Sequence, residues 1–189
     1  LSMEPVTPRA DELEEMLELE KRLTDREIDL EEFRGLFEKH PELYLVFRKD
    51  GRIIGEASGE LKDGKVLLES IAVREGFRGE GLGKEILEEF LERSRKYSEV
   101  VSVASARDTE GFYRSCGFEP EKVLLQVKKE NLPSDWRDDE RVENFRIEDD
   151  NFFIYLNPED YSRENFETLK KEFNAHSVNA ILERPTEST

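Results

Sequence analysis

The chain has 189 residues and a formal net charge of −17, with 40% charged and 36% hydrophobic residues. The apolar residues are clustered and periodic, so we expect a folded protein and not a disordered chain. A surface this acidic repels phosphate backbones and favours cationic partners, which argues against nucleic-acid binding.

The chain contains one cysteine, which excludes an internal disulfide framework and fits a reducing compartment. No apolar run approaches membrane-spanning length, and no secretory signal precedes the first helix. We therefore expect a cytoplasmic protein that does not bind membranes. Two histidines and one cysteine, scattered along the chain, give no metal-ligand spacing, so we expect no metal site.

The N-terminal part predicts two helices followed by a three-stranded antiparallel meander. The first helix is expected to start at Thr7-Pro8. The second is expected to start at Asp29, with Glu32 placed for a capping box. Two Asp-Gly pairs, which are strong hairpin signals, separate three strand-like runs at 43–47, 53–61 and 66–73.

The next segment predicts a helix over 81–96 with one apolar stripe, followed by a short strand at 99–105. A strand, a helix and another strand suggest a parallel crossover. A short helix within 108–118 is expected to end at Gly117, before a strand at 122–129.

After Lys129 the pattern changes to a polar linker, in which Trp136 is an expected anchor. It is followed by two strands about a turn, a helix and a last strand, expected at 145–156, 162–173 and 177–183. We therefore divide the chain into a domain of residues 1–129 and a C-terminal extension of residues 130–189. The extension either completes the main sheet or forms a small β-α-β appendage.

The stretch REGFRGEGLGKEIL (74–87) places four glycines in eight residues directly before a helix. Its glycine spacing matches neither the dinucleotide fingerprint nor the P-loop. What remains is a turn rich in backbone N–H groups at a helix N-terminus, which attracts phosphate. Arg78 and Lys84 would make this turn a local cationic pocket. The alternative is a tight turn that needs glycine for steric reasons alone.

The segment R-G-E-G-L-G matches the [RQ]-x-x-G-x-[GA] motif of the GNAT superfamily of N-acetyltransferases, with Arg78, Gly81 and Gly83 at the defining positions. ESIAV leads into it as that family's fourth strand does, and GFYRSCGF resembles the family's F-Y-x-x-x-G-F segment. Over about residues 5–129 the order of elements also agrees. The chain therefore resembles this family. In the segment before Tyr113 it departs, since many members carry asparagine where this chain has SARDTEG.

This resemblance implies an α+β fold, with a mixed, mostly antiparallel sheet flanked by helices and a C-terminal β-α-β extension. It also implies acetyl-CoA, or another acyl-CoA, as the acyl donor. The amides of residues 79–84 would hold the pyrophosphate, and the backbone of Ile71 and Val73 would bond the pantetheine. An amide near Val73 would polarise the thioester carbonyl. The expected cofactor-binding residues are Ile71, Ala72, Val73, Arg78, Gly79, Glu80, Gly81, Leu82, Gly83, Lys84 and Phe112.

Acyl transfer to an amine makes two proton demands, because an ammonium group titrates near ~10 and the leaving thiolate benefits from a proton. Tyr113 matches the family tyrosine that lies near the CoA sulfur, so the resemblance makes it the expected proton donor. The alternative is that Tyr113 only packs, with Phe112 in the core.

Glu69 is the candidate general base, because strand alternation puts it on one face with Ile71 and Val73. The alternative is a solvated carboxylate, or one that is bonded to a neighbouring strand. Glu56 and Glu60 on the adjacent strand are rivals, and a water relay can replace a dedicated base.

We therefore expect an acetyl-CoA-dependent N-acetyltransferase, in which a primary amine attacks the thioester directly. A small cationic molecule, a peptide N-terminus and a lysine side chain all fit the acidic charge as acceptors. The alternative is a non-catalytic GNAT-like module that binds CoA or a protein partner. A further hypothesis is that residues 145–183 mediate formation of a homodimer. We interpret Cys116 as a small buried residue.

Overall fold

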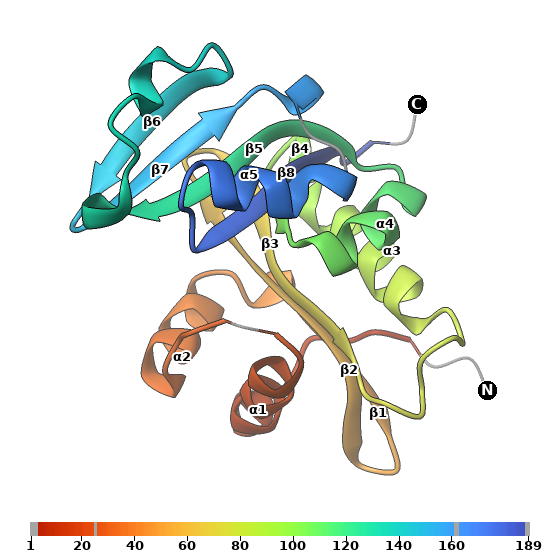
Figure 1. Cartoon of the computed structure of the whole chain (residues 1–189). Coiled ribbons are helices and arrows are strands. Elements are labelled where there is room, and N and C mark those ends of the chain that lie inside the picture. The colour runs from red at the N-terminus through yellow and green to blue at the C-terminus, as the bar shows by residue number, and fades with distance from the viewer. Residues whose placement is uncertain (1–3, 25, 161–162, 188–189) are drawn as a thin grey trace. The chain divides into compact units, whose positions relative to one another are not determined.

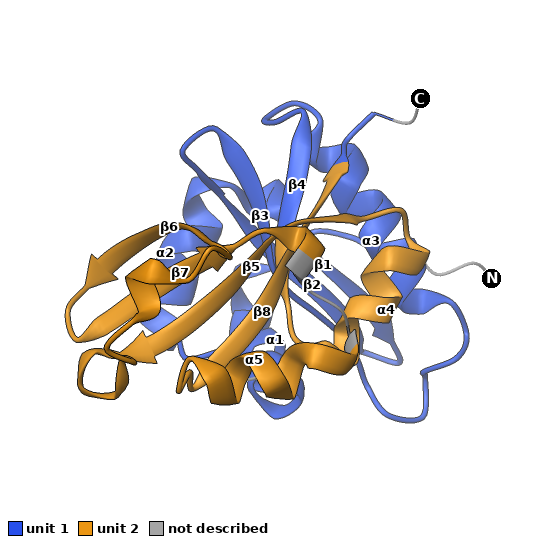
Figure 2. Ribbon diagram, turned by 45° about the horizontal axis from the view of Figure 1, so that its top comes forward, with its two compact units in different colours: residues 1–102, 185–189 blue, residues 103–184 orange. Residues whose placement is uncertain are grey.

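The computed structural model describes residues 4–24, 26–160 and 163–187. It divides the chain into two compact units, coloured separately in Figure 2. They comprise residues 1–102 with 185–189, and residues 103–184.

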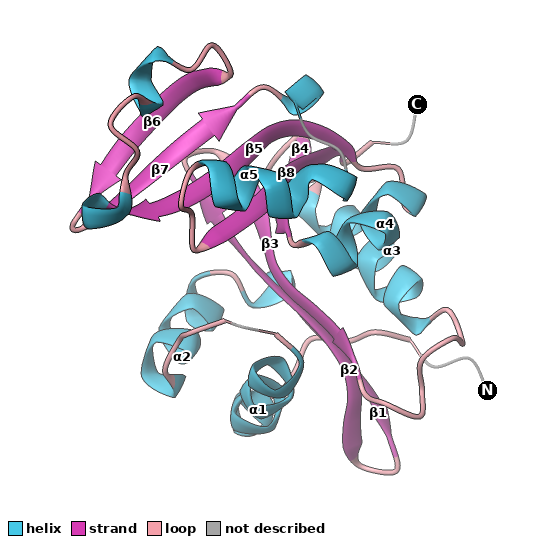
Figure 3. Ribbon diagram, in the orientation of Figure 1, coloured by secondary structure: helices cyan, strands magenta, loops and turns pink. Residues whose placement is uncertain are grey.

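Figures 1 and 3 show the elements in chain order. The helices are α1 (Leu13–Leu23), α2 (Leu30–Lys39), α3 (Leu82–Ser94), α4 (Arg107–Ser115) and α5 (Phe166–Glu172). The strands are β1 (Tyr44–Lys49), β2 (Arg52–Lys62), β3 (Lys65–Val73), β4 (Val100–Ser105), β5 (Glu119–Lys128), β6 (Val142–Glu148), β7 (Asn151–Leu156) and β8 (Ser177–Pro185).

The first unit is built on the antiparallel meander β1–β2–β3, as predicted. Its two hairpins turn at Asp50-Gly51 and Asp63-Gly64. Both aspartates have φ of 52°, and the glycines have φ of 76° and 77°. Two successive left-handed residues form the turn that matches the twist of paired strands, which is why Asp-Gly marks these hairpins in the sequence.

Helix α3 packs on one face of this meander at a distance that only glycine allows. A Cβ atom at Gly59 of β2 would lie 2.4 Å from Cζ of Phe90 and 2.5 Å from the carbonyl oxygen of Leu67. At Gly55 a Cβ would lie 3.6 Å from Cδ1 of Ile86, which is ordinary contact. The ring of Phe90 therefore fills the space that a side chain at residue 59 would need.

Helices α1 and α2 cover the opposite face. Tyr44 pairs with Ser58, which neighbours Gly59 along β2, so the two β2 residues face opposite sides. The Tyr44 ring meets those of Phe33 and Phe37 edge-on, with centroids 5.3 Å apart in each case. The buried core on this side consists of Leu13, Met16, Leu17, Leu19, Ile28, Phe33, Tyr44, Val46 and Ile53.

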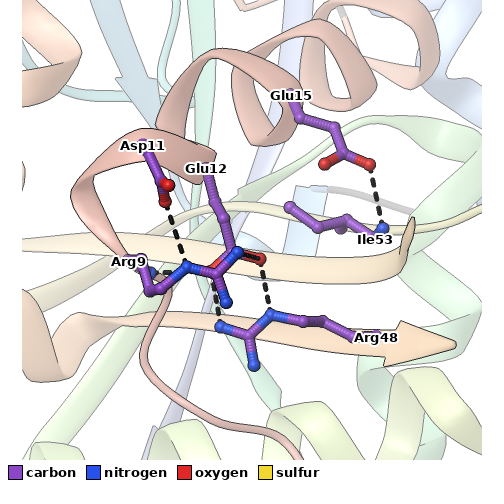
Figure 4. Close-up of polar contacts among 6 residues, drawn as sticks. All are labelled: Arg9, Asp11, Glu12, Glu15, Arg48 and Ile53. Atoms are coloured by element: carbon purple, nitrogen blue, oxygen red, sulfur yellow. Dashed lines mark hydrogen bonds and ion pairs between the residues drawn. The ribbon is translucent and has the colours of Figure 1, made fainter. Parts of the chain in front are cut away.

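Two carboxylates fasten the start of α1 to the sheet (Figure 4). Glu12 accepts two hydrogen bonds from the Arg48 guanidinium, a bidentate pair. Glu15 accepts a 2.9 Å bond from the amide of Ile53, beside the register shift that follows Phe47. The second bond gives a strand amide a partner from a helix side chain, so α1 is held by directional contacts as well as by apolar packing.

The predicted helix start at Thr7-Pro8 is wrong, because this segment runs beside β1. Val6 and Val46 exchange backbone hydrogen bonds of 3.0 and 2.8 Å in an isolated antiparallel bridge. A 3₁₀ turn follows, and α1 begins only at Leu13. By contrast, the predicted start of α2 is confirmed, since the Asp29 carboxylate accepts from the amide of Glu32 at 2.8 Å.

In the second unit the strand order is β8-β5-β7-β6, and each neighbouring pair is antiparallel. Strand β5 pairs with β8 on one side and with β7 on the other, so residues after 130 extend the sheet that contains β5. The linker residue Trp136 is buried and meets the rings of Phe145 and Phe152 edge-on. The predicted helix at 162–173 begins as an α-helix at Phe166, and residues 161–162 lie outside the described residues.

Candidate functional site

The end of β3 presents two backbone amides to the edge that faces away from β2. The Arg74 amide, just after β3, donates a hydrogen bond to the carbonyl oxygen of Ile54 in β2, at 2.7 Å. Successive residues of an antiparallel strand point their N–H groups to alternate sides, so the Ala72 amide also faces β2. The amides of Ile71 and Val73 therefore point to the other edge. That edge faces β4, the other neighbour of β3 in the strand order of the sheet.

The glycine turn follows directly and ends in the first turn of α3. Gly79 and Gly81 both have φ of 82°, a left-handed conformation that explains the glycines. A Cβ atom at either position would meet nothing within 4 Å, so no described atom fills the space there. Of the other predicted site residues here, Glu80 is exposed and Leu82 is buried in the core.

The N-terminus of α3 offers amides that its own helix does not use. Gly81 is the N-cap residue, and its carbonyl accepts from the Glu85 amide at 3.1 Å. The amides of residues 82–84 precede this bond, and helix geometry gives them no partner within the helix. Together with the positive end of the helix dipole, they can bind an anion.

The two cationic side chains of the turn differ in what they contact. Nε of Arg78 donates to the carbonyl oxygen of Val73 at 3.0 Å, so this side chain closes the turn onto the end of β3. Lys84 lines an open hollow whose other residues are mostly acidic. That hollow is lined by Glu4, Pro5, Gly81, Lys84, Glu85, Glu88, Glu89 and Glu92. The expected local cationic pocket is thus electrostatically mixed, and its anion-binding groups are mainly backbone amides.

Strand β3 carries one extra residue at the candidate base. Ser70 pairs with Ser58, but the next pair along the strands is Leu68 with Gly59. Glu69 is left over between them as a β-bulge. Regular alternation does not continue through a bulge, so the predicted common face of Glu69 with the two amide-presenting residues does not follow from the register.

The carboxyl of Glu69 has an environment suited to a general base. Glu69 is exposed at the surface, yet neighbouring atoms partly desolvate its carboxyl, and this desolvation is the largest cause that raises its pKa. The Arg26 guanidinium acts in the opposite sense, and the negative charges of Glu60 and Glu20 raise the pKa further. A carboxylate displaced towards neutrality accepts a proton more readily than an ordinary surface glutamate.

Of the two rival bases, Glu56 is fully buried, with 0% of its surface exposed. Its carboxyl accepts a 2.8 Å hydrogen bond from the Ser70 hydroxyl. A group without access to solvent cannot take a proton directly from an incoming amine. Glu60 is half-buried and remains a rival to Glu69.

The structure also places polar residues that the sequence analysis did not single out on the α1 side of β2. Glu20 of α1 accepts hydrogen bonds from Ser58 and from Arg26, the latter at 3.1 Å. Arg26 donates to Ser58 as well, at 3.0 Å. The signal for this cluster was polar alternation within an apolar strand, since Glu56, Ser58 and Glu60 occupy every second position of β2.

The proposed proton donor lies in the second unit. Tyr113 of α4 is only 5% exposed, and its ring meets those of Phe112 and Phe118 edge-on, at 5.3 and 5.5 Å. Phe112, taken as the core member in the packing alternative, is the less buried of the adjacent pair. Helix α4 ends before Gly117, whose φ of 88° confirms the predicted stop. Cys116 is buried and free, as expected.

This geometry has a counterpart in a known protein family. Residues 40–120 match the family described as acetyltransferase (GNAT) domain. This chain contains a GNAT acetyltransferase domain. A domain of this kind is that of an acyltransferase, and the α+β fold with a mixed sheet is the GNAT fold. None of the curated proteins compared with the chain matches it.

Solved GNAT structures share this fold at low sequence identity. The ribosomal-protein-S18-alanine N-acetyltransferase from Escherichia coli is 14% identical, with a TM-score of 0.58, and the match covers 100% of this chain and 96% of that one. The Salmonella typhimurium protein yncA, solved with its cofactor acetyl-CoA, is 15% identical over 100% and 96%, with a TM-score of 0.57. Arabidopsis thaliana Naa50, in complex with the bisubstrate analogue CoA-Ac-MVNAL, is 16% identical over 82% and 97%, with a TM-score of 0.56.

Within 4–24, 26–160 and 163–187, no helix is long and apolar enough to cross a membrane. In the same residues, histidine, cysteine and acidic side chains form no group of three or more that could hold a metal ion.

Proposed function

We propose that this protein transfers an acetyl group from acetyl-CoA to a primary amine. One observation carries the proposal: the amides of Ile71 and Val73, on the β4 side of β3, precede the open glycine turn at the N-terminus of α3. These groups form a continuous row of backbone donors, first for an extended amide-containing chain and then for an anion. Pantetheine joined to a pyrophosphate has this order of chemical groups.

The residues of the turn fit such a donor. The amides of residues 79–84 bind the pyrophosphate, and Arg78 stabilises the turn through its bond to Val73. When bound, acetyl-CoA supplies a thioester, whose carbonyl the Val73 amide polarises as a fixed dipole. Phe112 of α4 is a further proposed cofactor contact, on the family resemblance of the FY segment alone.

The proton demands are divided between two residues. Glu69 takes the proton that the acceptor ammonium must lose, because its raised pKa brings it nearer to that of the amine. Tyr113 donates a proton to the leaving thiolate. Its hydroxyl suits this role as a weak acid in an apolar surrounding that includes Phe112 and Phe118.

The acceptor is a cationic amine. Glu60 of β2 and Glu69 of β3 are close enough for their charges to interact, and the chain as a whole carries a net charge of −17. The net charge attracts ammonium groups at long range, and the two glutamates attract them locally. The bisubstrate analogue bound to Naa50 supports a peptide N-terminus as one acceptor class. Small amines and lysine side chains remain in the proposal.

The division into a domain of residues 1–129 and an extension of residues 130–189 stays a prediction, as does a homodimer through residues 145–183. The free, buried thiol of Cys116 suits a reducing compartment such as the cytoplasm.

The test is a panel of three acceptors with acetyl-CoA: a small diamine, a peptide with a free N-terminus, and a lysine peptide with a blocked N-terminus. We expect free thiol to appear with at least one of them, together with a product that has gained one acetyl group. Calorimetry with CoA serves as the companion measurement. CoA binding without turnover of any amine would favour the non-catalytic alternative, and absence of CoA binding would overturn the donor assignment.

A further inference from the structure

Two glutamates face each other in the interior of the first unit. Glu20 of α1 and Glu56 of β2 are both 0% exposed. Burying one carboxylate is costly unless hydrogen bonds or a counter-charge compensate it, and burying two close together is costlier. The contacts of their four oxygen atoms show how the pair is tolerated.

Hydrogen bonds compensate the burial of Glu20 fully but that of Glu56 only in part. One Glu20 oxygen accepts from the Ser58 hydroxyl and the other from the Arg26 guanidinium, at 3.1 Å for the latter. Glu56 has a donor on one oxygen only, the Ser70 hydroxyl at 2.8 Å. Among the described residues, Oε2 of Glu56 is buried and has no hydrogen-bond partner. Glu20 is therefore bound as a carboxylate, whereas an ionised Glu56 would leave half of its charge unsatisfied.

A proton on Oε2 of Glu56 removes this deficit. Two carboxylates are both acceptors and cannot bond to each other, but a carboxylic acid donates to a neighbouring carboxylate. The pKa of Glu56 is raised well above its ordinary value, first by burial, then by the negative charge of Glu20 and by the hydrogen bond that its protonated form makes to Glu20. Arg26 forms its ion pair with Glu20, at 3.1 Å, so the compensating positive charge contacts that member of the pair.

The pair is also connected to the bulge. Ser70, which donates to Glu56, directly follows the bulged residue Glu69. With a proton on Glu56, a hydrogen-bonded chain would run from Arg26 through Glu20 and Glu56 to the strand segment that carries the candidate base. The charged and titratable groups around it come from α1, the α1–α2 connection, β1, β2 and β3, and are Glu20, Arg26, Tyr44, Glu60 and Glu69.

We propose that Glu56 is a neutral carboxylic acid in the folded protein, donating to Glu20 and accepting from Ser70, and that it positions the bulge bearing Glu69. Glu56 is a positioning residue, since its carboxyl has no access to the substrate. The positioning role rests on the function proposed above, whereas the protonation state does not.

Glu56→Gln tests the protonation state, because the amide of glutamine reproduces the donor and the acceptor of a neutral acid. Above the ordinary carboxyl value of 4.5, unfolding of the wild-type protein releases the Glu56 proton, and unfolding of the variant does not. We expect the ratio of the two unfolding constants, wild type over Glu56→Gln, to rise by up to about tenfold per pH unit from about pH 5 upward. A ratio that stays constant over this range would overturn the proposal.

Infrared spectroscopy gives a direct second readout. The wild-type protein at neutral pH should show the C=O stretching band of a buried carboxylic acid, and Glu56→Gln should lack it. A wild-type spectrum with carboxylate bands alone would also overturn the assignment. Neither measurement needs an acceptor, so failure to find acetyl transfer leaves both tests intact.

The positioning role is tested with Ser70→Ala and Glu56→Ala, in the acceptor assay once an acceptor is known. We expect both variants to shift the acidic limb of the pH–rate profile and to raise KM for the amine about threefold or more, with Kd for CoA unchanged. Glu56→Gln should restore the wild-type profile. Profiles of the two alanine variants that superimpose on the wild type would remove the positioning role and leave only the protonated acid.

Discussion

Nε of Arg78 donates to the carbonyl oxygen of Val73 at 3.0 Å, which joins the first residue of the glycine motif to the last residue of β3. The carbonyl that it holds points to the same edge as the Val73 amide, because both groups of one residue share a side in an antiparallel strand. Arg78 therefore fixes the backbone where β3 ends and the glycine turn begins.

Arg78→Ala should weaken CoA binding by loosening this junction. We expect Kd to rise about three- to tenfold, equivalent to about 1 kcal/mol for one exposed charge-assisted hydrogen bond. Lys84→Ala should also weaken binding, but less, because its charge lies among glutamates. Calorimetry with CoA measures both. An unchanged Kd in Arg78→Ala would contradict the assignment of this turn.

Tyr113→Phe should lower turnover by at least about tenfold while Kd for CoA stays the same, because only the proton-donating hydroxyl is lost. Tyr97→Phe is the matched control. Its hydroxyl donates to Glu42 at 2.9 Å, away from the proposed chemistry, and the variant should turn over normally. Equal turnover in the wild type and Tyr113→Phe would exclude Tyr113 as the acid.

Glu69→Gln should remove the acidic limb of the pH–rate profile. A general base acts in its ionised form, so wild-type kcat/KM falls as the pH drops through the raised pKa of Glu69. The variant should be slower by about tenfold or more at neutral pH and nearly independent of pH on the acid side. Glu60→Gln is the parallel experiment, and an interchange of the two results would assign the base to Glu60.

Gly59→Ala should destabilise the protein by about 1–3 kcal/mol, because the new methyl group would overlap Phe90 and the Leu67 carbonyl. Gly35→Ala is the matched control in an open part of α2, where a Cβ meets nothing within 4 Å. It should stabilise by about 0.5–1 kcal/mol, since alanine favours a helix interior. Denaturant unfolding measures both, and a neutral Gly59→Ala would contradict the described packing of α3.

Glu12→Gln should remove about 2 kcal/mol at neutral pH, because Arg48 loses a buried charged partner. The Arg48 hydrogen bonds lower the pKa of Glu12 below its ordinary value of 4.5. Its contribution is therefore complete above that value and is lost as the pH falls through the lowered one. The stability difference between wild type and variant should shrink below about pH 4.5. A difference independent of pH would show that ionisation of Glu12 does not matter.

Local chemistry was sufficient to predict most of the elements. Asp50-Gly51 and Asp63-Gly64 specify their hairpins because few residue pairs accept two left-handed conformations in succession. Asp29 specifies the start of α2 because its carboxylate reaches the Glu32 amide within one turn. The glycine motif indicated the family for the same reason, since its function depends on backbone groups and conformations that a short stretch of chain determines.

Tertiary structure decided what depends on residues distant in the sequence. Thr7-Pro8 has the local signal of a helix start, but pairing of Val6 with Val46 keeps this segment extended. The bulge at Glu69 arises from register with β2, which strand alternation alone does not reveal. The state of Glu56 depends on Glu20, 36 positions earlier, and on Ser70 of the next strand. The sequence by itself determined the fold family and the conformation of the glycine turn, because these rest on local backbone geometry. Burial and pairing between strands and helices determined the environment of the acidic side chains.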